Sequence, residues 1–191
     1  MTVTEIADEV FKILGDRGRQ FWSQGDIEEI VKEGLRELSE QGLFKGRYNL
    51  LLIETQQFYT LPAGLIKILD AYDSEGLKWD VLQGQNPDNS RPYTIIVEDY
   101  ENIYIPFPED GKTLTIEYTK FADETGDIPL QNPDVLKYYA LSKALIYDDE
   151  VNNQQKAAIY DAMYQKRLKE LRDRAFKGYS AKPLTTSYQG F

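Results

Sequence analysis

Apolar residues return at three- and four-residue steps at the start of the chain, which is the spacing of one face of an α-helix. Thr2 and Glu5 have the spacing of a capping box, in which each side chain accepts a hydrogen bond from the other residue's backbone N–H. This pair predicts a helix that runs to about Leu14 and stops at Gly15. Residues 15–19 are rich in glycine and charge, and we expect them to form a link.

A second helix is predicted between Ser23 and Gly42. Ser23 is followed by Asp26 at the third position, which is a further helix-start signal, and Gly42 is placed to end the helix. One side carries the apolar stripe Ile27, Ile30, Val31, Leu35 and Leu38. The helix also holds five glutamates against two basic residues, which is the wrong sign for a helix that reads DNA.

The hydrophobic period changes to two in the middle of the chain. Residues 113–119 alternate between apolar and polar side chains, as in a half-buried strand, and residues 103–107 do the same. Asp110 and Gly111 are typical of a tight turn, so we expect these two strands to form a hairpin. Further short strands are expected at 58–61, 68–72, 77–82 and 93–97. Together the strands predict an antiparallel β-region over about 48–121, inserted between helices.

Two more helices are predicted after the β-region. Asn132 is a good N-cap with Pro133 at the first helical position. The helix that follows is apolar over so wide an arc that we expect it to contact two partners. Residues 148–153 interrupt the pattern and predict a turn before a last helix that ends near Lys177. This last helix carries a packing seam of Ala157, Tyr160, Tyr164, Leu168, Leu171 and Ala175.

The residues after position 177 have no helical period. A glycine hinge, small polar residues and spaced aromatic side chains indicate an extended C-terminal arm over 178–191. The predicted fold class is therefore α+β: a bundle of about four helices with an inserted antiparallel β-region and an extended C-terminal arm. The helical parts cover 1–45 and 130–177, and we expect residues 1–177 to form a single domain.

The composition excludes several kinds of chemistry. The 191 residues include no cysteine and no histidine. The chain therefore has no thiolate nucleophile and no disulfide, and it lacks both the usual general base near neutral pH and the commonest transition-metal ligand. Carboxylate or lysine catalysis and oxygen-only metal sites remain. We predict no cofactor, no metal site and no enzymatic activity.

Two groups of carboxylates are the candidates for the remaining chemistry. Residues 148–150 are three adjacent carboxylates, which point in different directions on a helix, so a solvated turn is the better interpretation. Asp70, Asp73 and Asp80 lack the spacing of a calcium-binding loop, and residues 73–76 instead indicate a hairpin turn.

The net charge of −10 is unevenly distributed. Residues 166–191 hold seven basic and two acidic residues, a net +5, so residues 1–165 carry −15. An acidic body does not favour binding to DNA phosphates, whereas the basic end is either a solvated helix end or a docking surface. No apolar run approaches the ~20 residues of a membrane-spanning helix, and the N-terminus lacks the pattern of a signal peptide. We expect a soluble protein that stays in the cell that makes it, with no membrane partner.

Four short segments, spread over most of the chain, carry a family resemblance. They are Phe21-Trp22-Ser23 with Ile27 and Ile30, Phe58-Tyr59-Thr60-Leu61-Pro62 with Ile66 and Ile68, Leu114-Thr115-Ile116-Glu117-Tyr118, and Asn132-Pro133-Asp134 with Tyr138-Tyr139-Ala140-Leu141. Asp161 and Tyr164 follow on the last helix. In their order and character these segments resemble the head–tail adaptor (connector) proteins of tailed bacteriophages, which in short-tailed phages are called tail tubular proteins.

The resemblance implies a structural subunit of a phage neck. It implies a homo-oligomeric ring, a dodecamer in the virion, that joins the portal protein to tail or nozzle proteins while DNA passes through the lumen as cargo. An acidic lumen would repel phosphates and let DNA slide. The subunit would be located in the virion neck, after assembly in the host cytoplasm.

The predicted docking site is the arm together with the basic helix end that precedes it. It consists of Arg172, Arg174, Lys177, Tyr179, Lys182, Leu184, Tyr188 and Phe191. The basic residues would steer the arm toward an acidic portal surface, and its apolar residues would fill pockets there. Three alternatives stay open: a tail-completion or stopper ring protein, a soluble interaction domain that forms no ring, and a small carboxylate-dependent hydrolase.

Overall fold

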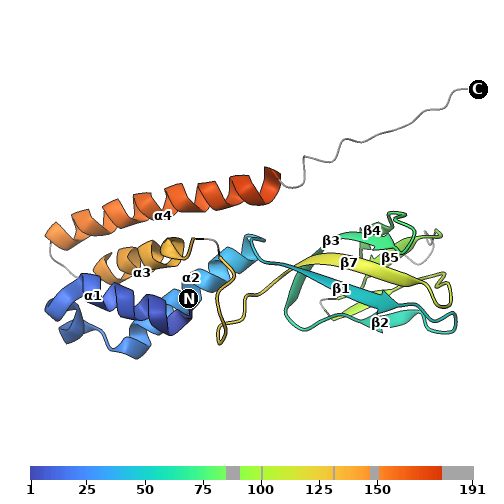
Figure 1. Ribbon diagram of the computed structural model, residues 1–191, viewed down its shortest axis with the longest axis horizontal. Coiled ribbons are helices and arrows are strands. Elements are labelled where there is room, and N and C mark those ends of the chain that lie inside the picture. Colours follow the sequence, from blue (N-terminus) through green and yellow to red (C-terminus); the bar gives the residue numbers. More distant parts are fainter. Residues whose placement is uncertain (85–90, 100, 131, 147–150, 178–191) are drawn as a thin grey trace, which may run out of the picture. The chain divides into compact units, whose positions relative to one another are not determined.

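The chain forms two compact units, one helical and one built of β-strands (Figure 1). The computed structural model describes residues 1–84, 91–99, 101–130, 132–146 and 151–177, without the side chains of 16–20, 151, 176 and 177. This part of the chain contains four helices and seven strands, which confirms the α+β class. The helical unit comprises Met1–Leu35 and Asp123–Phe191, and the β unit comprises Arg36–Ala122. That the two units act as a single domain stays a prediction.

Helix α1 spans Val3–Phe21 and begins with the predicted capping box. The Glu5 N–H donates to Thr2 Oγ1 at 3.2 Å, and the Thr2 N–H donates to Glu5 Oε2 at 2.9 Å. Gly15 leaves the helical conformation with φ 67° and ψ −163°, so the predicted stop is confirmed there. The expected link over 15–19 is wrong, because the backbone returns to a helix at once and continues to Phe21. Glycine adopts a positive φ without steric cost, so one residue is enough to break the helix.

Helix α2 spans Gln24–Glu40, and its predicted start and end are confirmed. The Ser23 N–H donates to Asp26 Oδ2 at 2.8 Å, and the Asp26 N–H donates to Ser23 Oγ at 3.2 Å. These hydrogen bonds from Ser23 lower the pKa of Asp26, because they favour the charged carboxylate. Gly42 follows the helix with φ 76°, and its N–H donates to the Ser39 carbonyl.

Helix α3 spans Asp134–Ile146 and is the central helix of the helical unit. Its first turn is capped by Asn132, whose Oδ1 accepts the Asp134 N–H at 3.1 Å. The buried side chains lie around most of its circumference: Val135, Leu136, Tyr139, Ala140, Leu141, Ser142 and Ala144. It packs against both α1 and α4, which confirms the expectation of two partners.

Helix α4 spans Val151–Lys177 and packs along α3 through the predicted seam. Ala157, Tyr164 and Leu168 are buried there, and the Tyr164 ring meets the Tyr139 ring of α3 at 5.3 Å. The predicted turn over 148–153 is wrong for 151–153, which are helical, and residues 147–150 lie outside the described residues. Asn153, in the first turn of this helix, is buried.

Helix α2 approaches α3 closely at Gly34. A Cβ atom placed on Gly34 would lie 2.7 Å from Cδ1 of Tyr139. The absence of a side chain therefore lets the Tyr139 ring lie directly against the α2 backbone. Tyr139 is 4% exposed and contacts α2 on one side and Tyr164 on another.

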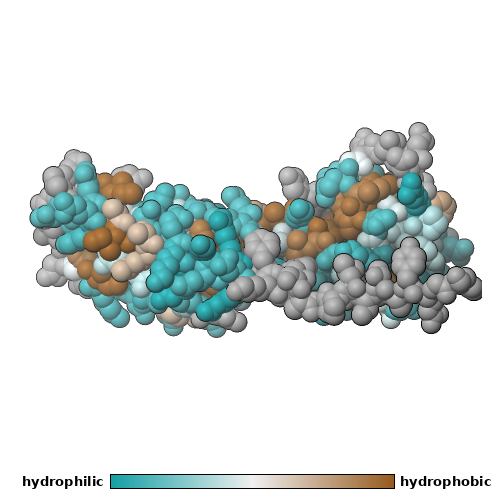
Figure 2. Space-filling model, turned by 90° about the horizontal axis from the view of Figure 1, so that it is seen from above, coloured by the Kyte–Doolittle hydropathy of each residue, from teal (hydrophilic) through white to brown (hydrophobic). Residues whose placement is uncertain are grey.

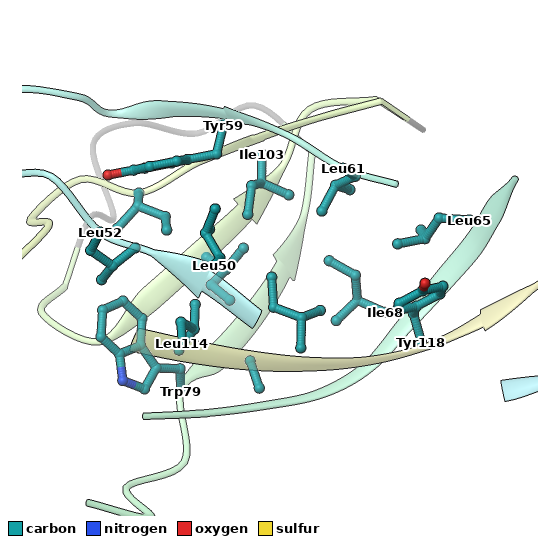
Figure 3. Close-up of a cluster of buried hydrophobic side chains, with 14 residues drawn as sticks. Leu50, Leu52, Tyr59, Leu61, Leu65, Ile68, Trp79, Ile103, Leu114 and Tyr118 are labelled. Carbon is teal, nitrogen blue, oxygen red and sulfur yellow. The ribbon is translucent and has the colours of Figure 1, made fainter. Parts of the chain in front are cut away.

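The β unit consists of two sheets that enclose one core. The first sheet has the order β1-β7-β3, formed by Lys45–Leu51, Thr113–Lys120 and Leu65–Asp73. The second has the order β2-β6-β5-β4, formed by Phe58–Thr60, Asn102–Tyr104, Thr94–Val97 and Asp80–Gln83. Buried side chains from both sheets, among them Leu50, Tyr59, Ile103 and Leu114, form a single cluster between them (Figure 3). The unit is a small sandwich, in which inner side chains alternate with outer ones along each strand.

Three details of the β unit differ from the sequence prediction. The expected hairpin through Asp110 and Gly111 is wrong, because β6 pairs with β2 and β5 whereas β7 pairs with β1 and β3. Pro106 and Pro108 lie between the two strands and lack the N–H groups that a continuous ladder needs. The region is also not purely antiparallel, because β4 and β5 pair in parallel. Strand β1 was not predicted as a strand.

Gly34 provides a test of the helical packing. Replacing Gly34 with Ala places a methyl group against the Tyr139 ring, and overpacking of this kind typically costs about 1–3 kcal/mol of unfolding free energy. The matched control is Gly25→Ala in the same helix, where the new Cβ meets only Ser23 Oγ at 3.7 Å. Denaturant unfolding should show G34A destabilised and G25A unchanged or more stable. Equal stability of the two variants would contradict this packing.

Candidate functional site

The predicted docking residues lie at the end of α4 and beyond it. Arg172 and Arg174 are exposed on the last turns of α4, where positive charge also interacts favourably with the C-terminal end of the helix dipole. Lys177 is the last residue of the helix, and its side chain is outside the described part. The remaining residues, Tyr179, Lys182, Leu184, Tyr188 and Phe191, also lie outside the described residues. The arm therefore stays a prediction.

The outer side of α4 carries a second apolar face. Ala158, Ile159, Ala162 and Met163 are all exposed, with Ile159 at 55% and Met163 at 43%. Their steps of one and four residues place them together on the helix surface, away from the buried seam. Figure 2 looks down on α4 and shows brown and tan surface over its first half and teal surface over its second half. The second half holds Lys166, Lys169, Arg172 and Arg174, all of them exposed.

A groove runs beside this face, between α3 and α4. It has a volume of about 510 Å³ and is lined by Ser142, Lys143, Ile146, Gln154, Ala157, Ala158 and Asp161. Ile146, at the end of α3, is 56% exposed. The groove and the outer face of α4 together form an exposed apolar surface of the kind that marks protein interaction sites.

The β unit has an apolar row across the outer face of its second sheet. Phe58, Tyr104, Ile96 and Leu82 are directly paired across the four strands, so their side chains point to the same side. The Phe58 and Tyr104 rings lie 5.1 Å apart. Phe58 is 56% exposed and Leu82 is 41% exposed, so both ends of the row face solvent, whereas Ile96 between them is only 3% exposed. An outer sheet face normally carries polar residues, so the exposed Phe58 and Leu82 are two smaller apolar spots available for contact.

One carboxylate in the described residues is fully buried, and it belongs to Asp73 at the end of β3. Its Oδ1 accepts the backbone N–H groups of Glu75 at 3.0 Å and Leu77 at 2.9 Å. Its Oδ2 forms an ion pair with Lys112 Nζ at 3.1 Å and faces the Trp79 indole N–H at 3.5 Å. The turn predicted at residues 73–76 is thus confirmed, and it is tied to a distant part of the chain.

These contacts set the charge state of Asp73. Burial on its own would raise the pKa of the carboxyl, but the donors from Leu77, Lys112, Glu75 and Trp79 together lower it below its ordinary value. The pKa of Lys112 is raised, because its ammonium donates to Glu109 and to Asp73. The pair is therefore charged in the folded protein and holds the loop before β7 against the turn after β3.

The other carboxylates considered as a site do not gather around an ion. Asp70 forms an ion pair with Lys78, Asp80 is exposed, and Asp73 is engaged as described above. Within the described ranges, no group of three or more Asp, Glu, His or Cys side chains is arranged to hold a metal ion. Residues 148–150 lie outside the described residues, so the other carboxylate candidate is not tested.

Sequence reasoning missed the outer apolar surfaces and the buried ion pair. The apolar residues on the outer side of α4 were visible, but their exposure depends on which side of the helix meets α3. The ion pair joins residues on two different loops, and a lone Asp or Lys carries no sequence signal for such a contact. The row across the second sheet depends on strand order, which is not readable from the strands themselves.

Helix α4 buries one face on α3 and exposes a second apolar face, and the second sheet exposes Phe58 and Leu82 at the two ends of a row. Exposed apolar surfaces of this kind are typical of proteins that assemble with other chains. The family model described as SU10 adaptor protein matches residues 1–186, so the chain belongs to this family of bacteriophage head–tail adaptor proteins. No curated protein matches the chain. The predicted adaptor family is thus confirmed, and the chain is a structural phage adaptor protein. No helix in the described part of the chain is long and apolar enough to cross a membrane.

The buried carboxylate gives a prediction for stability and its pH dependence. Replacing Asp73 with Asn leaves Lys112 without its buried partner charge and should lower the unfolding free energy at pH 7 by about 3 kcal/mol. Because the folded pKa lies below the unfolded value, the charged carboxylate stabilises the fold above about pH 4, and this contribution is lost as the pH falls further.

Denaturant unfolding at pH 7 and at pH 3 measures both effects. The stability gap between wild type and D73N should shrink at pH 3. The matched control is Asp80→Asn, which removes the same charge from an exposed position in the same unit and should change stability by less than ~0.5 kcal/mol. A gap that is small at pH 7, or that does not shrink with acid, would show that Asp73 does not stabilise the β unit in this way.

Proposed function

We propose that this adaptor protein forms a ring in the phage neck, joins the portal protein to tail or nozzle proteins and lets DNA pass through the ring lumen. The observation that carries the proposal is the family match over residues 1–186. The ring is a dodecamer in the virion, it assembles in the host cytoplasm, and its role is structural, without catalysis of its own.

The charge distribution supports passage of DNA without binding. Residues 1–165 carry a net charge of −15. A ring of such subunits repels the phosphate backbone, so DNA can slide through it. Binding of DNA requires cations that release counterions, and these are concentrated at the other end of the chain.

The basic end of α4 supports docking to the portal. Arg172 and Arg174 are exposed on α4 just before residues 178–191, in which the sequence spaces apolar and aromatic anchors. Exposed charges of one sign accelerate the encounter with an oppositely charged surface, whereas buried aromatic anchors supply most of the binding energy. We therefore place portal docking on this end of the chain, with the arm as the anchor.

Ring assembly is tested by mixing the purified chain with the portal protein of the same phage. Light scattering and negative-stain images should show a ring-shaped complex with several copies of the chain on each portal. A chain that stays monomeric by itself is compatible with the proposal, because such subunits can order on docking. A chain that stays monomeric and unbound in the presence of the portal would overturn it.

Docking through the arm is tested by deleting residues 178–191. The truncated chain should keep its helix content and stability but lose portal binding. The double variant Arg172→Glu/Arg174→Glu should slow association about tenfold or more at low salt, and this effect should fade as salt rises. The control Lys67→Glu/Arg91→Glu changes the net charge equally on exposed positions of the β unit and should associate normally. Unchanged portal affinity of the truncated chain would place the contact elsewhere.

A further inference from the structure

Helix α2 presents an acidic stripe along its exposed side. Asp26, Glu29 and Glu33 are exposed and lie on one face, opposite the buried side chains of Ile27 and Val31. Glu29 also forms an ion pair with Lys32, and exposed pairs of this kind contribute little and exchange partners readily. The stripe is a negatively charged surface that needs a positive partner to become buried.

An apolar spot precedes this stripe along the chain. Phe21 is 64% exposed, the highest value among the large apolar residues of the described part of the chain. Gly25 follows on the first turn of α2, where it is exposed and has no side chain. The outer surface around α2 therefore has an exposed apolar ring and a glycine near the start of the helix, and acidic side chains further along.

Along the outer face of α4, small and apolar residues also come before charged ones, but here the charge is positive. Ala158, Ile159, Ala162 and Met163 come first, and Lys166 and Lys169 follow on the same side of the helix. Lys166 stands four residues after Ala162, as Glu29 stands four residues after Gly25, and both steps measure about 6 Å along a helix. Lys169 and Glu33 follow one turn further on. The two surfaces match in register when the helices run parallel.

We propose that the outer face of α4 docks on the outer face of α2 in a neighbouring copy of this chain, with Ala162 beside Gly25 and with Lys166 and Lys169 facing Glu29 and Glu33. The proposal rests on the proposed ring and names its subunit contact. Small residues at the centre allow the helix backbones to approach closely, and Ile159 and Met163 cover the exposed Phe21 of the neighbour.

The occupant is a second copy because both complementary surfaces belong to the same helical unit. Helix α4 carries seven basic and three acidic residues, a net +4, and α2 carries six acidic and two basic residues, a net −4. When two different surfaces of one chain are complementary, the contact is head-to-tail, and a head-to-tail contact that closes on itself generates a ring. The acidic surface is covered by the neighbour's cations, and the apolar surfaces leave water together.

The absence of cysteine from the chain allows a direct test. We introduce Gly25→Cys and Ala162→Cys together in the full chain, assemble it with the portal protein and oxidise it. The expected result is a ladder of covalently linked oligomers on a non-reducing gel. Mixing the two single-cysteine variants should give linked dimers and no longer products, which shows that the link joins different copies. The matched control pairs Ala162→Cys with Thr4→Cys, an exposed position on α1, and should give no ladder.

A lysine-reactive cross-linker applied to the same assemblies distinguishes failure of the proposed α4–α2 contact from failure of the proposed ring. If it links several copies while the cysteine pair gives no ladder, the ring stands and the α4–α2 contact is wrong. If neither reagent links copies in the presence of the portal, the proposed ring fails as well.

Charge reversal tests the same contact without cross-linking. The variant Lys166→Glu/Lys169→Glu makes both surfaces acidic, and Glu29→Lys/Glu33→Lys makes both basic, so each variant alone should lose about tenfold or more in assembled fraction. An equimolar mixture of the two variants should recover assembly, because every contact in an alternating ring again joins opposite charges. Loss in each variant without recovery in the mixture would overturn the proposed pairing.

Discussion

The helical unit depends on the burial of α3, which is too apolar around its circumference to be covered from one side. Its Tyr139 ring lies where Gly34 of α2 has no side chain, and it contacts the Tyr164 ring of α4. Burial of the apolar surface of α3 therefore determines where α1, α2 and α4 pack. The Lys137 ammonium at the start of α3 pairs with Glu9 of α1 at 3.1 Å, which aligns the helices at the edge of this contact.

A consequence of this arrangement is that α4 is covered on one side only. A helix of 27 residues, about 40 Å long, buries its Ala157–Tyr164–Leu168 seam on α3 and leaves Ala158, Ile159, Ala162 and Met163 exposed to solvent. In an isolated chain these apolar groups stay in contact with water, and their burial against another molecule is energetically favourable. The same helix ends in exposed arginines, so its two halves are suited to different contacts, one through apolar packing and one through charge.

The β unit is held together by a different kind of interaction. Its core is a cluster of aliphatic and aromatic side chains between two sheets, but its loops are joined by the buried Asp73–Lys112 pair. Such a pair is specific in geometry, because each charge must find its partner when water is removed. It therefore fixes how the turn after β3 meets the loop before β7. On the outer face of the second sheet, Phe58 and Leu82 remain exposed at the two ends of their row.

Local signals in the sequence determined the starts of α1, α2 and α3, the end of α2, the α+β class and the basic character of the chain's end. The capping boxes at Thr2 and Ser23 and the cap at Asn132 act within one helical turn, so a few neighbouring residues specify them. Net charge is a sum over residues and is likewise independent of the fold. The family resemblance also rested on short segments, and the family match confirms it.

Only the tertiary structure decided which strands pair and which helix faces remain exposed. Strand β7 pairs with β1 and β3 rather than with its neighbour β6, because Pro106 and Pro108 interrupt the ladder and the core needs apolar faces from both sheets. Helix α4 has two apolar stripes of similar spacing, and the position of α3 selects the one that is buried. A sequence pattern records that a face is apolar, but burial is a property of what lies against it, and that is set by contacts between residues far apart in the chain.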